Sequence, residues 1–382
     1  MFKRIFEAGI INLLNSALSF IITLIIVQQS GVDKVGEIYF LLASLSVILL
    51  VNIFFPPAYS IVKIQESQVF IKYFFSMYFY SQFIIVLIVM LFFYNKYNIW
   101  TISIILYCIA SSWVSFYDVL LQSKGMIKNF YSAVLFGSVI KVCLLVLFIR
   151  TDTLIMELLM YLVFGQIASL IIMMYMNSKK GRQIVFNTSL AGLYGFYRSN
   201  FLNIKGFYLS SIFKRLFDNL PALAFGTILT STAMGVFSIF QKCLVFGVSF
   251  IRIIESLLLS KEYSAQINLK MKVFIAVLSI ILTFIASLVY SFLTIGVMLE
   301  YCLLMSFLVI PVFITIEIRA KYIKMYNMFH VNVAMVLSML AMYSFSKLFL
   351  LGESQSIFIS YSVMLLVQAL WLTLTLIIKR KE

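Results

Sequence analysis

Twelve apolar runs, each long enough to cross a membrane as a helix, decide what this chain can fold into. The chain has 382 residues, of which 63% are hydrophobic and only 11% are charged, and a soluble domain of this composition would have too little polar surface. The sequence therefore predicts an all-α polytopic membrane protein. The predicted spans are residues 8–29, 36–62, 73–94, 99–121, 131–149, 154–176, 206–229, 234–260, 273–297, 300–318, 329–350 and 356–378.

Lysine and arginine are distributed unequally over the connections between these spans. The N-terminal segment and every second connection after it hold twenty basic residues, and the other connections hold four. Cytoplasmic connections of membrane proteins collect basic residues, so both termini are predicted to be cytoplasmic. The same rule accounts for the net charge of +15, and nucleic acid is not predicted as a partner.

The longest connection separates the spans into two sets of six. We expect two halves of the same orientation, arranged around a central cavity, as transporters with parallel repeats have. The predicted boundaries are 1–180 for the N-terminal half, 181–205 for a cytoplasmic linker and 206–382 for the C-terminal half.

An ungapped offset of 199 residues supports this repeat. The offset places Gly36 on Gly235, and each of these glycines opens a span after a short outer turn. It also places Asp118 on Glu317 and keeps the register of the spans over four helices. Identity at this offset is low, so the agreement of register carries the prediction.

Five basic residues lie inside predicted spans, where an ionisable side chain is costly unless it faces protein or a hydrated cavity. The faces that carry them also carry small or hydroxyl residues. Cationic stripes in an apolar setting predict the wall of a cavity for an anionic substrate. The five candidate substrate-binding cations are Lys141, Lys214, Arg215, Lys242 and Arg252.

Four of these cations also have a structural interpretation. Lys141 either contacts substrate or forms an ion pair with a neighbouring helix, for example with Asp218. The two basic residues near the cytoplasmic end of their span, at positions 214 and 215, can extend to the membrane interface. Arg252 is one helical turn from Glu255 and can pair with it.

Three acidic residues are candidates for ion coupling or gating. Asp218 lies near the middle of its span, where it either titrates during transport or neutralises a lysine. Asp118 and Glu317 lie near the cytoplasmic ends of their spans. They either hold loop lysines such as Lys124 and Lys321 or close a gate with them.

The sequence gives little support to an enzyme. It contains no GxxxxGK[ST] phosphate loop, and its outer connections are too short to hold a sugar acceptor for a glycosyltransferase or polymerase. His330 is the one histidine, at the edge of a span, and the four cysteines have neither metal-ligand nor disulfide spacing. We therefore predict no catalytic residues, no cofactor and no metal site.

Two short motifs, Val35–Tyr39 and Met234–Phe237, open spans two and eight with a glycine after a tight turn. Together with the twelve spans in two halves and the basic residues in spans seven and eight, they resemble one family. This family is the O-antigen and polysaccharide flippases, the lipid-linked oligosaccharide transporters of the multidrug/oligosaccharidyl-lipid/polysaccharide exporter superfamily.

The resemblance implies a protein of the bacterial inner membrane. It would move an undecaprenyl-diphosphate-linked oligosaccharide, the repeat unit of O-antigen or capsule, from the cytoplasmic to the outer leaflet by alternating access. Lys214, Arg215 and Lys242 would then face the diphosphate and acidic sugars. The implied partners are this lipid-linked substrate, membrane lipids, and a polysaccharide polymerase with its chain-length regulator.

The alternative transport function is an ion-coupled drug or small-solute antiporter of the same architecture. For cationic drugs such an antiporter needs buried acids more than buried lysine and arginine. A membrane glycosyltransferase or polymerase is a weaker alternative, because the outer connections are short.

Overall fold

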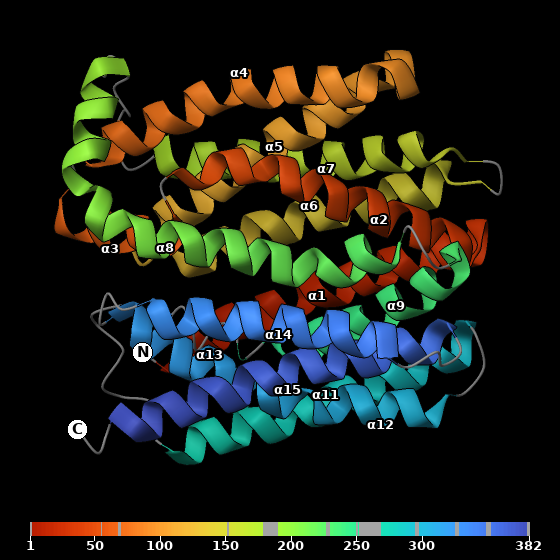
Figure 1. The fold of residues 1–382 in the computed structure, drawn as a ribbon. Helices are drawn as coiled ribbons and strands as arrows, with labels where there is room; N and C mark the ends of the chain where they lie inside the picture. Colours follow the sequence, from red (N-terminus) through yellow and green to blue (C-terminus); the bar gives the residue numbers. More distant parts are fainter. Residues whose placement is uncertain are drawn as a thin grey trace. The chain divides into compact units, whose positions relative to one another are not determined.

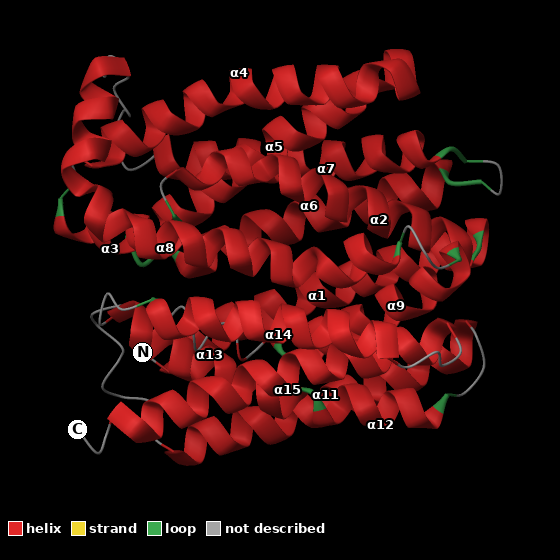
Figure 2. Ribbon diagram, in the orientation of Figure 1, coloured by secondary structure: helices red, strands yellow, loops and turns green. Residues whose placement is uncertain are grey.

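The described residues of the computed structural model form helices joined by short connections, and they include no β-strand (Figure 2). A helix overlaps each of the twelve predicted spans, which confirms the all-α membrane architecture. The structure describes residues 2–54, 56–67, 70–150, 153–178, 190–226, 230–249, 251, 269–294, 298–324, 328–348 and 353–379.

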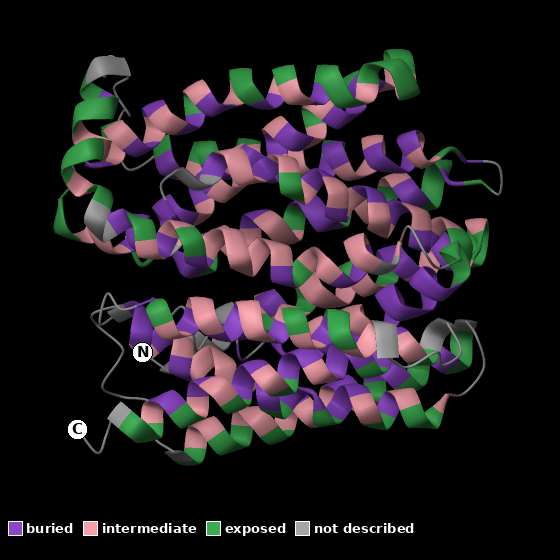
Figure 3. Ribbon diagram, viewed as in Figure 1, coloured by how far each residue is buried: buried purple, intermediate pink, exposed green. Residues whose placement is uncertain are grey.

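Nine helical segments among these residues are long and apolar enough to cross a membrane, and the longest, Phe70–Ser123, contains two successive helices. Many large apolar side chains of these helices are exposed; Phe92, for example, is 74% exposed and Leu147 is 72% exposed. Exposed positions, green in Figure 3, recur along the helices. Exposed apolar bands of this extent are expected on helices that face lipid.

The chain folds into two compact units. Unit 1 comprises Met1–Ala43, Arg150–Asp152 and Leu216–Glu382, and unit 2 comprises Ser44–Ile149 and Thr153–Arg215. Two of these boundaries fall inside helices, α2 (Val32–Ile48) and α8 (Leu190–Phe225), and none falls between α7 (Ile155–Ser178) and α8, where the predicted halves are joined. The division into 1–180, 181–205 and 206–382 describes a sequence repeat and stays a prediction.

Unit 2 is built on α4 to α7, with α6 packed along α7 and α5 packed against both α4 and α7 (Figure 1). Its core is aromatic: the rings of Phe74 and Phe116 stack at 5.1 Å, and Tyr78 meets each of them edge-on. The elements that contribute to unit 2 are α2 (Val32–Ile48), η1 (Leu49–Phe54), α3 (Pro57–Glu66), α4 (Phe70–Tyr97), η2 (Asn98–Trp100), α5 (Thr101–Ser123), α6 (Ile127–Phe148), α7 (Ile155–Ser178) and α8 (Leu190–Phe225).

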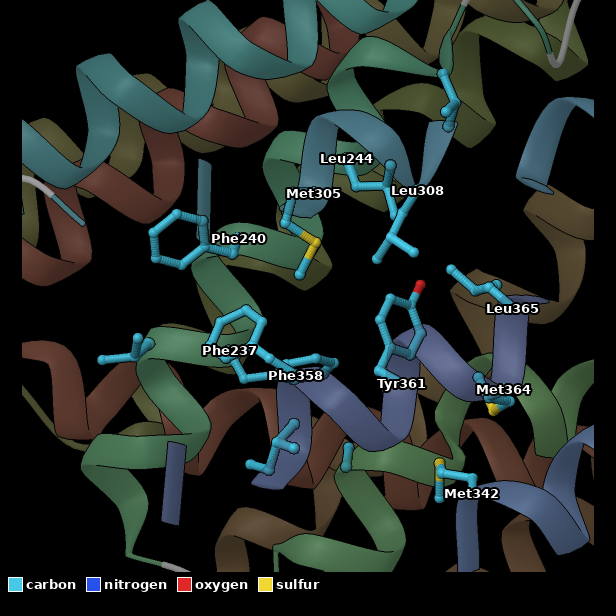
Figure 4. Packing of buried hydrophobic residues seen from close by; sticks show 14 of the residues in the cluster. Phe237, Phe240, Leu244, Met305, Leu308, Met342, Phe358, Tyr361, Met364 and Leu365 are labelled. Carbon is cyan, nitrogen blue, oxygen red and sulfur yellow. The ribbon is translucent and has the colours of Figure 1, made fainter. Parts of the chain in front are cut away.

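Unit 1 has its core between α9, α12 and α15. The rings of Phe237, Phe240 and Phe358 gather there, with Phe358 at 5.5 Å from each of the other two, and Tyr361 lies against Phe237 (Figure 4). Besides the first part of α2 and the end of α8, the helices of this unit are α1 (Phe2–Ser30), α9 (Ser231–Gly247), α11 (Leu269–Thr294), α12 (Leu299–Phe307), α13 (Val309–Lys324), α14 (Phe329–Leu348) and α15 (Glu353–Lys379).

The second span differs from the continuous run predicted over residues 36–62. Helix α2 ends at Ile48, a 3₁₀ segment follows, and α3 begins at Pro57. Pro56 is extended, with φ −57° and ψ 137°, and Pro57 takes the first turn of the new helix. Neither proline can donate a backbone hydrogen bond, so the helix is interrupted here and not merely bent.

Helix α8 also differs from its predicted span, because it begins at Leu190 and not at residue 206. Its first part carries Arg198 and Lys205, which lower the hydropathy without preventing helix formation. Pro221 lies inside this helix, which continues to Phe225.

Candidate functional site

The first parts of α2 and α9 cross at two glycines within unit 1. A Cβ atom added to Gly36 would lie 2.0 Å from the carbonyl oxygen of Ser231, and one added to Gly235 would lie 2.2 Å from the carbonyl oxygen of Val32. The contact is reciprocal, because the 199-residue offset relates Val32 to Ser231 as it relates Gly36 to Gly235. Only residues without a side chain allow two helices to approach so closely.

The same crossing is joined by a hydrogen bond from the Thr232 hydroxyl to the Asp33 carboxylate. These residues are also related by the offset of 199. Contacts between equivalent residues arise where a two-fold axis passes, so the crossing fits the local symmetry that the repeat predicts.

Lys242 lies on α9, and its ammonium group donates a hydrogen bond to the Thr23 hydroxyl of α1. The Thr23 hydroxyl donates in turn to the Ser19 carbonyl oxygen at 3.1 Å, so its oxygen is free to accept. Asn12, further along α1, donates to the Ser249 carbonyl oxygen at 2.8 Å. Among the described residues of unit 1, no carboxylate forms a salt bridge with Lys242.

Lys141 lies half-buried on α6, beside a glycine of α7. A Cβ atom added to Gly165 would lie 2.2 Å from Cγ of Lys141 and 2.7 Å from its Cε, so the lysine stem occupies the space of the missing side chain. Within the part of unit 2 that the structure describes, the Lys141 ammonium group has neither a hydrogen bond nor a salt bridge.

Lys214 and Arg215 each interact with another group of unit 2. Lys214 interacts electrostatically with Asp118, whose carboxylate also accepts a hydrogen bond from Gln122 at 2.6 Å. Arg215 donates to the backbone carbonyl oxygen of Ser46 at 3.4 Å, near the end of α2. Their charge is thus partly engaged by the protein itself.

Glu317 lies between two lysines at one end of unit 1. It is 2.6 Å from Lys272 of α11 and 3.3 Å from Lys321 of its own helix. The predicted pair with Lys321 is therefore present, and Lys272 adds a second salt bridge. In unit 2, the Lys124 ammonium group donates a hydrogen bond to the Asn177 side-chain oxygen at 2.8 Å. A gating role for Asp118 or Glu317 stays a prediction.

Two candidates remain, Asp218 and Arg252. The Asp218 side chain is exposed, and it interacts electrostatically with Tyr39 of α2. Arg252 lies outside the described residues. Ion coupling through Asp218 stays a prediction.

Two polar features were not singled out from the sequence. The Tyr39 hydroxyl donates to the Gln241 side chain, joining α2 to α9 next to Lys242. In unit 2 the 3₁₀ segment places Asn52, which is 3% exposed, 2.7 Å from the Ser81 hydroxyl. The rule applied to charged residues, that a polar group inside a span must face a partner or a cavity, would have found Gln241 and Asn52 as well.

The sequence matches no protein-family model and no curated protein. Solved structures are similar over nearly the whole chain. An inward-facing multidrug resistance MATE family transporter of the MOP superfamily is 12% identical, with a TM-score of 0.63 over 98% of this chain and 99% of that chain. A MATE transporter in complex with MaL6 is 13% identical, with a TM-score of 0.62 over 99% and 97%.

The MATE multidrug transporter DinF-BH, solved as a complex, is 12% identical, with a TM-score of 0.62 over 99% of this chain and 94% of that chain. At these identities the likeness concerns the fold alone. The chain therefore has the all-helical fold of the MATE transporters of the MOP superfamily.

Proposed function

We propose that this protein is a secondary transporter that works by alternating access and carries amphipathic substrates with a negatively charged group. The fold supports transport, because MATE transporters occur in inward-facing and in outward-facing conformations. The observation that carries the choice of charge is that Lys141 and Lys242, inside apolar helices, have no carboxylate partner among the described residues of their own units.

The physical reason is the cost of a charge in a nonpolar environment. A lysine inside a membrane span without a counter-ion is unfavourable by several kcal/mol unless it faces a partner or a hydrated cavity. An anionic substrate supplies the missing charge. Lys214 and Arg215 are weaker candidates for this role, because Asp118 and a backbone carbonyl already engage them.

Two substrate classes fit this proposal. Multidrug transporters share the fold, and this favours the antiporter of drugs or small solutes over the lipid-linked oligosaccharide flippase. For this chain we expect the solutes to be anionic amphiphiles. No family model or curated protein matches the chain to separate the two classes.

The lipid-linked oligosaccharide is kept as the second candidate because of the same two lysines. A diphosphate cannot cross hydrocarbon unshielded, and fixed cations replace part of its hydration while the lipid tail stays in the bilayer. Under this candidate the protein lies in the bacterial inner membrane with both termini cytoplasmic, and a polymerase with its chain-length regulator receives the product.

Substrate charge is tested in proteoliposomes with a matched pair of fluorescent amphiphiles, one a carboxylate and the other its cationic ester. We expect faster uptake of the carboxylate. Faster uptake of the cationic ester would contradict the proposed substrate charge.

Lipid extraction from cells that lack the protein separates the two substrate classes. Accumulated lipid-linked repeat units would support the flippase. Increased sensitivity to anionic amphiphiles, with normal lipid-linked intermediates, would support the antiporter. Increased sensitivity to cationic drugs alone would speak against both.

A further inference from the structure

Helices α6 and α7 approach each other through two glycines, and Lys141 lies at this approach. A Cβ atom added to Gly137 of α6 would lie 1.9 Å from the Ser169 hydroxyl oxygen and 2.2 Å from the Gly165 carbonyl oxygen. One added to Gly165 of α7 would overlap the stem of Lys141 and would also lie 2.6 Å from the Gly137 carbonyl oxygen of α6. The helices are thus close enough for a long side chain of one to lie flat along the other.

The Lys141 stem is fixed by shape and not by a polar contact. The Ser169 hydroxyl of α7 donates to the Gly165 carbonyl oxygen at 3.0 Å. Lys141 itself has no hydrogen bond or salt bridge within the described part of unit 2. Packing of its carbon atoms limits the rotamers of the stem, while the ammonium group keeps its capacity to bind an anion.

We infer that Gly165 is a positioning residue for substrate recognition: by lacking a side chain, it lets Lys141 lie along α7 and fixes the place of the ammonium group that meets the anionic group of the substrate. The inference rests on the proposed function. An alanine at position 165 would put a methyl group 2.2 Å from Cγ of Lys141 and force the stem into another rotamer.

Gly137 provides the matched control. Alanine at this position also forces α6 and α7 apart, because it would strike Ser169 and the Gly165 carbonyl, but its Cβ atom meets no atom of Lys141 among its nearest contacts. A purely structural role of the glycines predicts the same defect for Gly137→Ala and Gly165→Ala. A positioning role predicts different defects.

The experiment uses the full-length protein in proteoliposomes with two fluorescent probes, a polyprenyl diphosphate and the corresponding polyprenol. Initial flipping rates per inserted molecule give KM and the maximal rate for each probe. We expect Lys141→Met and Gly165→Ala to raise the KM for the diphosphate by about tenfold to a hundredfold, the loss typical of a charge-assisted contact. We expect both to leave the KM for the polyprenol unchanged.

We expect Gly137→Ala to change the maximal rates of the two probes alike and to leave the ratio of their KM values unchanged. If Gly165→Ala shows the Gly137→Ala pattern, Gly165 is a packing residue only and the inference is wrong. If Lys141→Met leaves the KM for the diphosphate unchanged, the proposed role of Lys141 in substrate binding fails as well. The two failures are therefore distinguishable.

A second variant tests the inference even if Gly165→Ala is not inserted. Lys141→Met combined with Ile140→Lys moves the cation to the neighbouring residue, at the same depth, where its stem does not follow Gly165. We expect this variant to keep the high KM of Lys141→Met, whereas Lys141→Arg, whose stem passes the same glycine, stays within about threefold of the original. Recovery of the original KM by the moved lysine would overturn the inference.

Discussion

Lys141 in unit 2 and Lys242 in unit 1 are both lysines inside apolar helices, but the protein holds them by different means. Lys242 donates to the Thr23 hydroxyl of a neighbouring helix. Lys141 has no such partner among the described residues of its unit, and its stem is confined by the shape of α7 at Gly165. The difference shows that a charge in a membrane helix can be oriented either by a weak polar contact or by packing alone, and each mode is lost through a different substitution.

The largest effect is expected when both lysines are replaced. If each lysine favours an anionic substrate on its own, Lys141→Met/Lys242→Met should raise the KM for an anionic probe by about a hundredfold or more, the product of two charge-assisted contacts. Initial rates in proteoliposomes measure this. A double variant no worse than either single one would mean that the lysines act at one shared step.

The second-largest effect is expected at Gly235, which lies on α9, the helix of Lys242, where α9 crosses α2. Gly235→Ala would place a methyl group 2.2 Å from a backbone carbonyl oxygen, so we expect a loss of about 1–3 kcal/mol in stability, visible as a lower Tm. Gly195→Ala on α8 is the control, since a Cβ atom there meets nothing within 4 Å. An unchanged Tm for Gly235→Ala would show that α2 and α9 do not approach each other this closely.

Thr23 tests the polar mode of holding a lysine. Thr23→Val keeps the shape of the side chain and removes the hydroxyl, which is worth about 1 kcal/mol, so the KM for an anionic probe should rise roughly fivefold. Thr23→Ser should stay close to the original protein. Equal KM values for the valine and serine variants would mean that Lys242 does not depend on this contact.

The smallest effect is expected for a substitution of Lys96. It is an exposed lysine in the last turn of α4, and Lys96→Gln should change the KM and the stability by no more than about 0.5 kcal/mol. A clear rise in KM for this variant would indicate that surface charge, and not the two lysines within the spans, selects the substrate.

Much of the fold follows from hydropathy, and the exceptions have physical causes. The apolar runs predicted a helix at every span, because backbone groups in lipid must bond within a helix. The interruption after Ile48 was not predicted, since Pro56 lies eight residues further on and Asn52 is the one polar residue between them. The early start of α8 was missed because its first part is too polar to read as a span.

The candidate cations could also be predicted from the sequence, but the contacts that distinguish one cation from another could not. The partner of Lys242 is 219 residues away in the chain, and no periodicity within one helix indicates it. The repeat offset aligned Gly36 with Gly235 as equivalent positions, but it did not predict that the helices meet at these two glycines. The position of the Lys141 stem depends on which face of α7 packs against α6, and the sequence of either helix alone does not determine that face.

The most direct measurement is the affinity of the purified protein for a polyprenyl diphosphate compared with the matching polyprenol, in the same detergent. If the two span lysines serve an anionic substrate, the diphosphate should bind about a hundredfold more tightly, and Lys141→Met/Lys242→Met should remove most of that preference. Equal affinity for the two probes, or a preference that survives the double substitution, would contradict the role of these lysines.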